Sequence, residues 1–197
     1  MRCHAFAFAL LVSVAPAAVV AQAPIPPADQ QIAVAVLPLP AEFRADATVL
    51  GYSPEGKLVT LRPGKGAMTC LADDPKEEKA FHVACYHNSM EPFMARGRAL
   101  RASGVTGDKV DSVRFKEVKA GKIRMPKQAA LWSLSGDASV VDMAAGKVTP
   151  AARALYVVYM PYATPATSGI PAAPVRGAPW VMYPGTPKAH IMFVPSM

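Results

Sequence analysis

The first 23 residues decide which part of this chain folds and in which chemical surroundings it does so. Arg2 and the amino group form a short basic region, and an apolar run follows over residues 5–20. This order is typical of a secretory signal peptide. Small residues allow cleavage after Ala21 or Ala23, and we favour Ala21 because the second cut leaves Pro24 beside the cleaved bond. An uncleaved membrane anchor is disfavoured, since the run is near or below the roughly 20 residues that span a bilayer.

This segment sets the expected organisation of the chain. We expect residues 1–21 to be the signal peptide, residues 22–30 a flexible leader and residues 31–197 one α+β domain. No later stretch is apolar enough to cross a membrane, so we expect a periplasmic or secreted protein without a transmembrane segment. The 20 prolines exclude a long helical bundle or coiled coil, because proline interrupts helices.

Export leaves two cysteines and therefore one possible intramolecular pair. Cys3 lies in the signal peptide, so Cys70 and Cys85 remain. Oxidising surroundings favour a disulfide between them, and it closes a loop of about 15 residues, which is worth roughly 3 kcal/mol in the chain-entropy model. A redox pair or a thiolate metal site is the alternative. The chain lacks a Cys-x-x-Cys motif and exported thiolates rarely stay reduced, so we predict a structural bridge.

Apolar periodicity and turn residues predict strands on both sides of two helices. Residues 30–37 fit either a helix capped by Asp29 or a strand, and Ser89 and Asp108 are the expected caps of the two central helices. The predicted helices cover residues 90–102 and 109–120, after one helical turn over residues 40–45. The predicted strands cover residues 48–52, 57–62, 68–71, 81–86, 129–135, 155–160, 180–183 and 190–194. This order predicts an α+β fold with a mainly antiparallel sheet.

Lys and Arg outnumber Asp and Glu by 21 to 14, and the excess is concentrated in the helical middle of the chain. The basic residues there are Arg96, Arg98, Arg101, Lys109, Arg114, Lys116, Lys119, Lys122, Arg124 and Lys127. Such a cluster can contact phosphates. However, Asp108, Asp111 and Glu117 interleave with it and no aromatic ladder supports base stacking, so we predict no nucleic-acid partner. A solvated helix face is the favoured interpretation, and lipid headgroups or cell-wall polymers are the alternative.

The sequence lacks the motifs of the common enzyme classes, and we predict no cofactor. It contains no G-x-S-x-G, H-E-x-x-H or phosphate-loop pattern. A histidine base with a carboxylate partner is the remaining catalytic hypothesis. The candidate bases are His82, His87 and His190, and the candidate carboxylates are Asp73, Asp74 and Glu91. His190 is the favoured base, because it follows a Pro-Gly turn at the start of a strand, where side chains often line a cleft.

Ten methionines and four histidines raise a second hypothesis, Cu(I) binding. His87, Met90 and Met94 are spaced at i, i+3 and i+7, and His190 and Met192 share one face of the last strand. Imidazole and thioether groups suit Cu(I). Core packing remains the favoured interpretation, because methionine fills cores well and His87 precedes the expected helix cap. We therefore predict no metal site. These five residues are the candidate ligands of the alternative hypothesis.

Three segments of the chain carry distinctive motifs. They are residues 66–75, with the motif Thr-Cys-x-x-Asp-Asp-Pro, residues 161–164, and residues 179–192, with the motif Trp-x-Met-x-Pro-Gly-Thr-Pro-x-Ala-His-x-Met. In these segments the chain resembles a family of small exported bacterial proteins of unassigned function. The family has no established activity, so the resemblance implies no catalytic role. It implies a secreted single domain whose recurring motifs contain Cys70, Asp73, Asp74 and His190.

The favoured functional hypothesis is a non-enzymatic exported domain that binds a small ligand or an envelope component. It predicts a concave apolar site near a surface loop over residues 161–179, without a tight acid–base cluster. The alternatives are a small hydrolase-like enzyme that uses His190, and Cu(I) binding by the Met and His residues named above.

Overall fold

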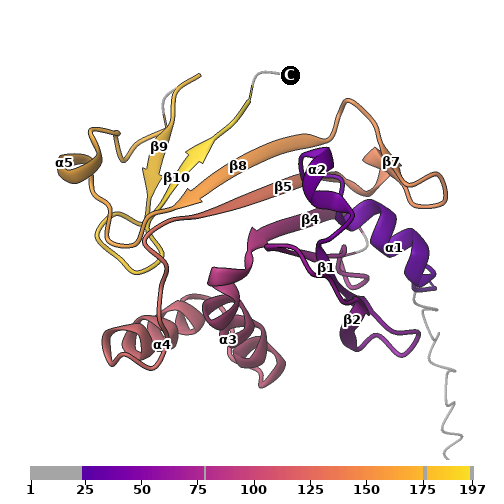
Figure 1. Ribbon diagram of the computed structural model, residues 1–197, viewed down its shortest axis with the longest axis horizontal. Coiled ribbons are helices and arrows are strands. Elements are labelled where there is room, and N and C mark those ends of the chain that lie inside the picture. The colour runs from indigo at the N-terminus through magenta and orange to yellow at the C-terminus, as the bar shows by residue number, and fades with distance from the viewer. Residues whose placement is uncertain (1–23, 78, 175–176, 196–197) are drawn as a thin grey trace, which may run out of the picture.

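The computed structural model describes residues 24–77, 79–174 and 177–195 (Figure 1). The expected signal peptide and Cys3 lie outside the described residues. The helices are α1 (Ala28–Ala35), α2 (Ala41–Arg44), α3 (Glu91–Ala102), α4 (Asp108–Lys119) and α5 (Pro165–Ser168), with short 3-10 turns at Asn88–Met90 and Ala138–Val140.

The described strands form one large sheet and one small one. The strands are β1 (Thr48–Tyr52), β2 (Leu58–Arg62), β3 (Met68–Leu71), β4 (Ala80–His87), β5 (Ala129–Asp137), β6 (Val141–Asp142), β7 (Lys147–Val148), β8 (Arg153–Tyr159), β9 (Trp180–Met182) and β10 (His190–Phe193). The large sheet has the order β2-β1-β3-β4-β5-β8-β10-β9, and β6 pairs with β7. Only β1 and β3 are parallel neighbours; the other pairs are antiparallel.

The predicted α+β fold with a mainly antiparallel sheet and two central helices is confirmed. The hairpin β1–β2 turns at Gly56, whose φ of 73° is a left-handed conformation that glycine adopts without strain. The turn over residues 184–187 joins β9 to β10 as expected, and Gly185 supplies a second left-handed residue there.

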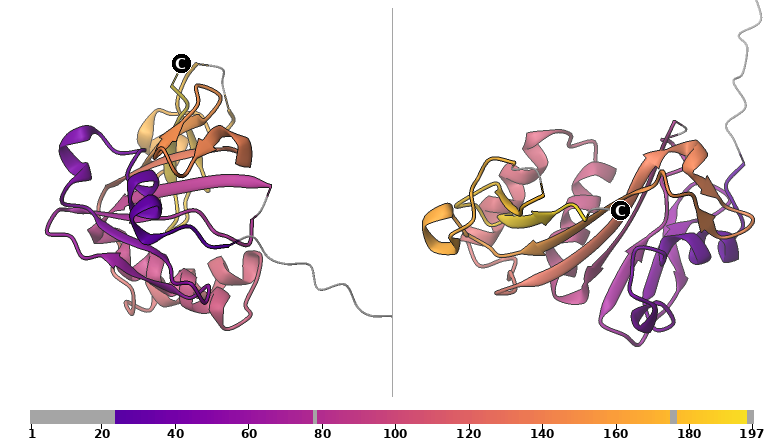
Figure 2. Two further views of the ribbon diagram at one scale, coloured as in Figure 1. Left: turned by 90° about the vertical axis from the view of Figure 1, so that its right-hand side faces the viewer. Right: turned by 90° about the horizontal axis from the view of Figure 1, so that it is seen from above.

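Helices cover both faces of the large sheet. On one face α1 and the segment that follows it pack over β1, β3 and β4, and Ala35 and Leu39 share a core with the buried Cys70 and Cys85. On the other face α3 and α4 lie side by side, and Phe93 packs near Tyr86 (Figures 1 and 2). Cys85 and Tyr86 serve opposite cores because successive residues of a strand point to opposite faces.

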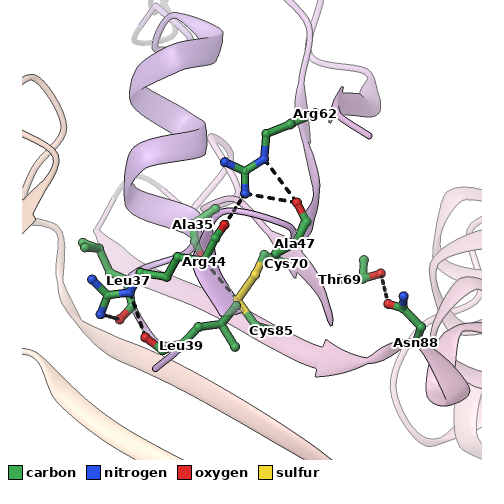
Figure 3. The surroundings of a disulfide bond; sticks show 10 residues. All are labelled: Ala35, Leu37, Leu39, Arg44, Ala47, Arg62, Thr69, Cys70, Cys85 and Asn88. Carbon is green, nitrogen blue, oxygen red and sulfur yellow. Dashed lines mark hydrogen bonds between the residues drawn. A yellow bond between two sulfur atoms is a disulfide. The ribbon is translucent and has the colours of Figure 1, made fainter. Parts of the chain in front are cut away.

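The predicted Cys70–Cys85 disulfide is present. The two cysteines are register partners on the neighbouring strands β3 and β4, as expected (Figure 3). Arg44 and Arg62 surround the bridge with hydrogen bonds to main-chain carbonyl groups. Arg44 donates to Leu37 and Leu39, and Arg62 donates to Ala47 and to Arg44. These bonds fix the segment between α1 and β1 over the disulfide.

Three helix starts differ from the expectation. The first helix begins at Ala28, so the expected leader over residues 22–30 already contains helix; Pro27 precedes it and Asp29 lies in its first turn. Ser89 does not cap α3, because the His87 side chain accepts from the Ser89 N–H and starts a 3-10 turn first. The N-cap of α4 is Gly107 (φ 57°), so Asp108 lies inside the helix.

Candidate functional site

Two hollows meet beside the loop that follows β3. One has a volume of about 450 Å³ and the other about 700 Å³. These volumes lie in the range of small-molecule sites. We call the two hollows together the Asp73 groove. The residues that line both are Tyr52, Asp73, Asp74, Glu77 and Ala80.

Hydrogen bonds from backbone N–H groups fix the two aspartates of the groove. Asp73 Oδ1 accepts a hydrogen bond of 2.8 Å from the His82 backbone N–H, which ties the loop back to β4. Asp74 Oδ1 accepts from the Lys76 backbone N–H at 3.0 Å, the local turn that aspartate commonly forms. The disulfide joins the strands on either side of this loop, so both ends of the loop are anchored.

Gln31 holds the N-terminal wall of the smaller hollow. Its side chain is 3% exposed and donates to the carbonyl oxygens of Pro26 (2.7 Å) and Tyr52 (2.9 Å). Its Oε1 accepts from the Tyr52 N–H at 2.8 Å. The Gln31 amide therefore pairs with β1 as a neighbouring strand would. It places Pro24 and Ile25 along the hollow, which Met143 also lines.

The part of the groove that both hollows share is acidic. Burial raises the pKa of Asp73 to about 6; the His82 N–H opposes this rise and the charge of Asp74 adds to it. Burial likewise raises the pKa of Tyr52 to about 12, with help from Asp74 and Asp73. Among the residues that the structure describes, no ion pair includes Asp73, Asp74 or Glu77.

The larger hollow adds an apolar floor and a basic wall. Leu58, Leu71 and Ala84 come from the face of the sheet that looks toward α3. Arg98 and Arg101 come from the C-terminal half of α3. Arg98 is already engaged, because it donates to Glu91 at 2.6 Å and to the Tyr86 hydroxyl at 2.8 Å.

His190 lies far from the aspartates. The strand register places His190 level with Tyr159 and Ala129, whereas Asp73 bonds to His82, which is level with Ser135. Six strand residues separate these levels, which is roughly 20 Å along the sheet. The structure therefore does not bring His190 together with Asp73 or Asp74.

The surroundings of His190 are those of a packed side chain. Its ring is 6% exposed, lies 5.0 Å from the Tyr159 ring and 5.7 Å from the Tyr183 ring, and bonds through Nδ1 to the Lys188 carbonyl at 2.7 Å. Burial lowers the pKa of His190. The nearby Asp111 carboxylate already accepts hydrogen bonds from Lys188 and Arg114.

The three Met candidates for Cu(I) belong to one apolar core. Met90 is 0% exposed, and Met94 and Met192 pack against the same core from different elements. His87 ends β4, and its Nδ1 lies 2.8 Å from the Ser89 hydroxyl. In the described ranges, no group of three or more His, Cys, Asp or Glu side chains is arranged to hold a metal ion.

Sequence reasoning singled out Asp73 and Asp74 but missed the other parts of their site. Tyr52 ends a strand as a register partner of Leu58, and only the sheet order brings it beside a loop that follows β3. Gln31 had a local signal, since it is the polar residue that precedes the apolar positions 32–37.

The apolar concavity expected near residues 161–179 has a partial counterpart. A separate hollow of about 370 Å³ is lined by Tyr156 and Phe193 and by residues 177–179, at the end of that loop. It contains no charged residue among its described lining, unlike the Asp73 groove. The groove therefore offers both shape and charge, whereas this hollow offers shape alone.

Comparisons with protein-family models, with curated proteins and with solved structures find no match to this chain. Across residues 24–77, 79–174 and 177–195, no helix has the length and hydropathy that a bilayer span requires. The proposed function therefore rests on the geometry and charge of the groove.

Proposed function

We propose that the protein is an exported, non-enzymatic domain that binds a small ligand in the Asp73 groove. The observation that carries the proposal is that two hollows of ligand size meet at an aspartate whose charge is opposed by burial. A concave, partly apolar site that contains titratable groups with shifted pKa values is the usual form of a ligand site. The Cys70–Cys85 disulfide supports export, because such bonds persist in oxidising compartments.

The groove favours a ligand that combines a positive charge with an apolar body. Asp73, Asp74 and Glu77 supply negative charge that no cation of the described chain neutralises by an ion pair. Ile25, Pro26 and Met143 supply apolar surface a short distance away in the same hollow. An amine with an alkyl or aryl group satisfies both.

Binding is favoured over catalysis by the residue types in the groove. Its described lining contains no Ser, Thr or Cys that could act as a nucleophile. Its tyrosine has a raised pKa and so stays neutral at physiological pH. Of the candidate bases, His190 lines neither hollow, whereas His82 lines the larger one and its pKa is lowered by burial.

Alkylammonium ions of increasing chain length test this proposal. We expect hexylammonium and octylammonium to raise the melting temperature of the protein at pH 7.5, and hexanoate at equal concentration to leave it unchanged. The D73N variant keeps an oxygen for the His82 N–H but lacks the charge, so it should lose most of the ammonium effect. Because Asp73 titrates near pH 6, the effect in the unmodified protein should weaken as the pH falls below 6.

A matched control is the D142N variant, which removes an exposed carboxylate outside the groove. It should respond to octylammonium as the unmodified protein does. Equal stabilisation by ammonium and carboxylate ions, or an undiminished response of D73N, would overturn the proposal. Export is tested separately, since mass spectrometry of protein from its native host gives both the N-terminus and the cystine.

A further inference from the structure

The positive charge of this protein is confined to one part of the chain. Residues 96–127 contain ten of the 21 Lys and Arg residues but three of the 14 Asp and Glu residues. The remaining chain has eleven of each and is formally neutral. The net charge of +7 therefore arises from α3, α4 and the segment that follows α4.

Most of these basic side chains are exposed and free of carboxylate partners. Arg96, Arg98 and Arg114 form ion pairs with Glu117, Glu91 and Asp111. The other seven are exposed, and none forms an ion pair with another described residue. We call them the basic surface: Arg101, Lys109, Lys116, Lys119, Lys122, Arg124 and Lys127.

The core of the basic surface is one face of α4. Lys109 and Lys116 are seven residues apart, and Lys119 lies three further, so the three side chains project from neighbouring turns of one helix face. The opposite face is occupied, because Val110 and Arg114 are buried against α3. Asp111 and Glu117 lie on the flanks of this helix face and already form ion pairs. The lysine face is thus the unpartnered face of α4.

The shape and composition of this surface suit an extended, flat anionic surface rather than a polysaccharide or a nucleic acid. Of its seven residues, only Arg101 lines any of the described hollows. No exposed large apolar or aromatic side chain of the described chain belongs to residues 96–127, so no aromatic side chain there can stack on a base or a sugar. Five of the seven are lysines, whose hydrated point charges attract a charged surface without requiring the paired contacts that arginine makes.

We infer that the basic surface docks the protein on membranes rich in anionic phospholipid. Juxtaposed Lys and Arg residues are each attracted by such a surface within about one Debye length. The inference is independent of the Asp73 groove, because only Arg101 belongs to both. It also explains why the positive charge is concentrated in residues 96–127. A helix face that is merely solvated requires no such concentration.

Vesicle co-sedimentation of the full chain tests the inference. We expect binding to vesicles with 40% phosphatidylglycerol in 50 mM salt, and loss of that binding in 500 mM salt. Vesicles of phosphatidylcholine alone measure the contribution of apolar residues, including residues 1–23. The triple variant K109E/K116E/K119E should bind the anionic vesicles about a hundredfold more weakly.

A second triple variant, K57E/K65E/K147E, is the matched control. These three lysines are exposed and lie outside the basic surface, so the variant has the same net charge with the surface intact. It should keep most of the binding, and circular dichroism should show both variants folded. Equal losses in the two variants would overturn the inference, because the total charge would then suffice. Absence of binding in 50 mM salt, or tighter binding to a soluble anionic polysaccharide, would also overturn it.

Discussion

At the scale of single residues, Asp73 is held in surroundings that oppose its own charge. Its pKa of about 6 in the folded protein exceeds the value of about 4 expected in an unfolded chain. Between these pH values the folded state binds more protons, so the stability falls as the pH rises through this window. Above pH 6 the ionised carboxylate therefore lowers the free energy of unfolding, and below pH 4 it does not.

Replacing Asp73 by Asn should consequently stabilise the protein. We expect the free energy of unfolding of D73N to exceed that of the unmodified protein at pH 8 by about 1 kcal/mol, a value limited by partial exposure. At pH 4 the two proteins should be equally stable. Urea denaturation at both pH values measures the difference. A variant that is less stable at pH 8 would mean that the charge supports the fold, and a ligand would no longer be needed to explain it.

Gly97 is required by the close approach of Arg114. The Arg114 guanidinium is 4% exposed, lies 3.9 Å from the centre of the Phe93 ring and donates to the Phe93 carbonyl. A methyl group on Gly97 would lie 2.9 Å from Arg114 Nη1. Although alanine is the better helix former, we expect G97A to lower the free energy of unfolding by about 1–3 kcal/mol through this overlap.

A double-mutant cycle separates the overlap from other effects of the G97A change. In an Arg114→Ala background the clash is absent, and G97A should then be neutral or stabilising. Chemical denaturation of the four proteins gives the coupling free energy. Equal destabilisation by G97A in both backgrounds would show that Arg114 is not the neighbour that excludes a side chain.

At the scale of elements, the disulfide anchors β3 to β4 and with them the loop that carries Asp73. We expect the C70A/C85A variant to lose about 3 kcal/mol of unfolding free energy, because the bridge closes a loop of 15 residues. Reductant should lower the urea midpoint of the unmodified protein and leave that of the variant unchanged. Identical midpoints for variant and oxidised protein would contradict this.

The N-terminal segment depends on one side chain in a similar way. Gln31 makes three hydrogen bonds, and the two with Tyr52 replace strand pairing along β1. We expect Gln31→Ala to cost about 2–3 kcal/mol, since it leaves partly buried main-chain groups at Tyr52 unpaired. Limited proteolysis should then cut before Ala28 faster than in the unmodified protein. Unchanged cleavage and stability would show that the segment is held by its apolar contacts.

Most elements were predictable because their signals are local. Strand alternation and the turn before Gly56 predict the first hairpin, and β3 matches its predicted bounds. The start of α1 was not predictable from Asp29, because Pro27 ends the extended segment and allows a helix directly after it. Asp73 could be noticed in its motif, but its partners Tyr52 and Gln31 are brought to it by the parallel β1–β3 pair, which no local pattern encodes.

At the scale of the whole molecule, one sheet is shared by cores on its two faces. Trp132 packs against the core around the disulfide, whereas its chain neighbour Leu131 packs against the core under α3 and α4. Because β4 and β5 contribute to both cores through alternate residues, one core cannot unfold without exposing strands that also form the other. This coupling favours a single cooperative unit over the two halves of the sheet.

Two tryptophans placed far apart in the sheet test this cooperativity. Trp132 lies in β5 near its middle, and Trp180 lies in the edge strand β9. In W132F and W180F, which each retain one tryptophan, we expect the fluorescence midpoint in urea to coincide with the midpoint from circular dichroism of the same variant. Each substitution can shift stability, but the two probes must shift together. A fluorescence transition of Trp180 at lower urea than the loss of secondary structure would show that β9 and β10 unfold separately, and the expectation of one domain over residues 31–197 would then be wrong.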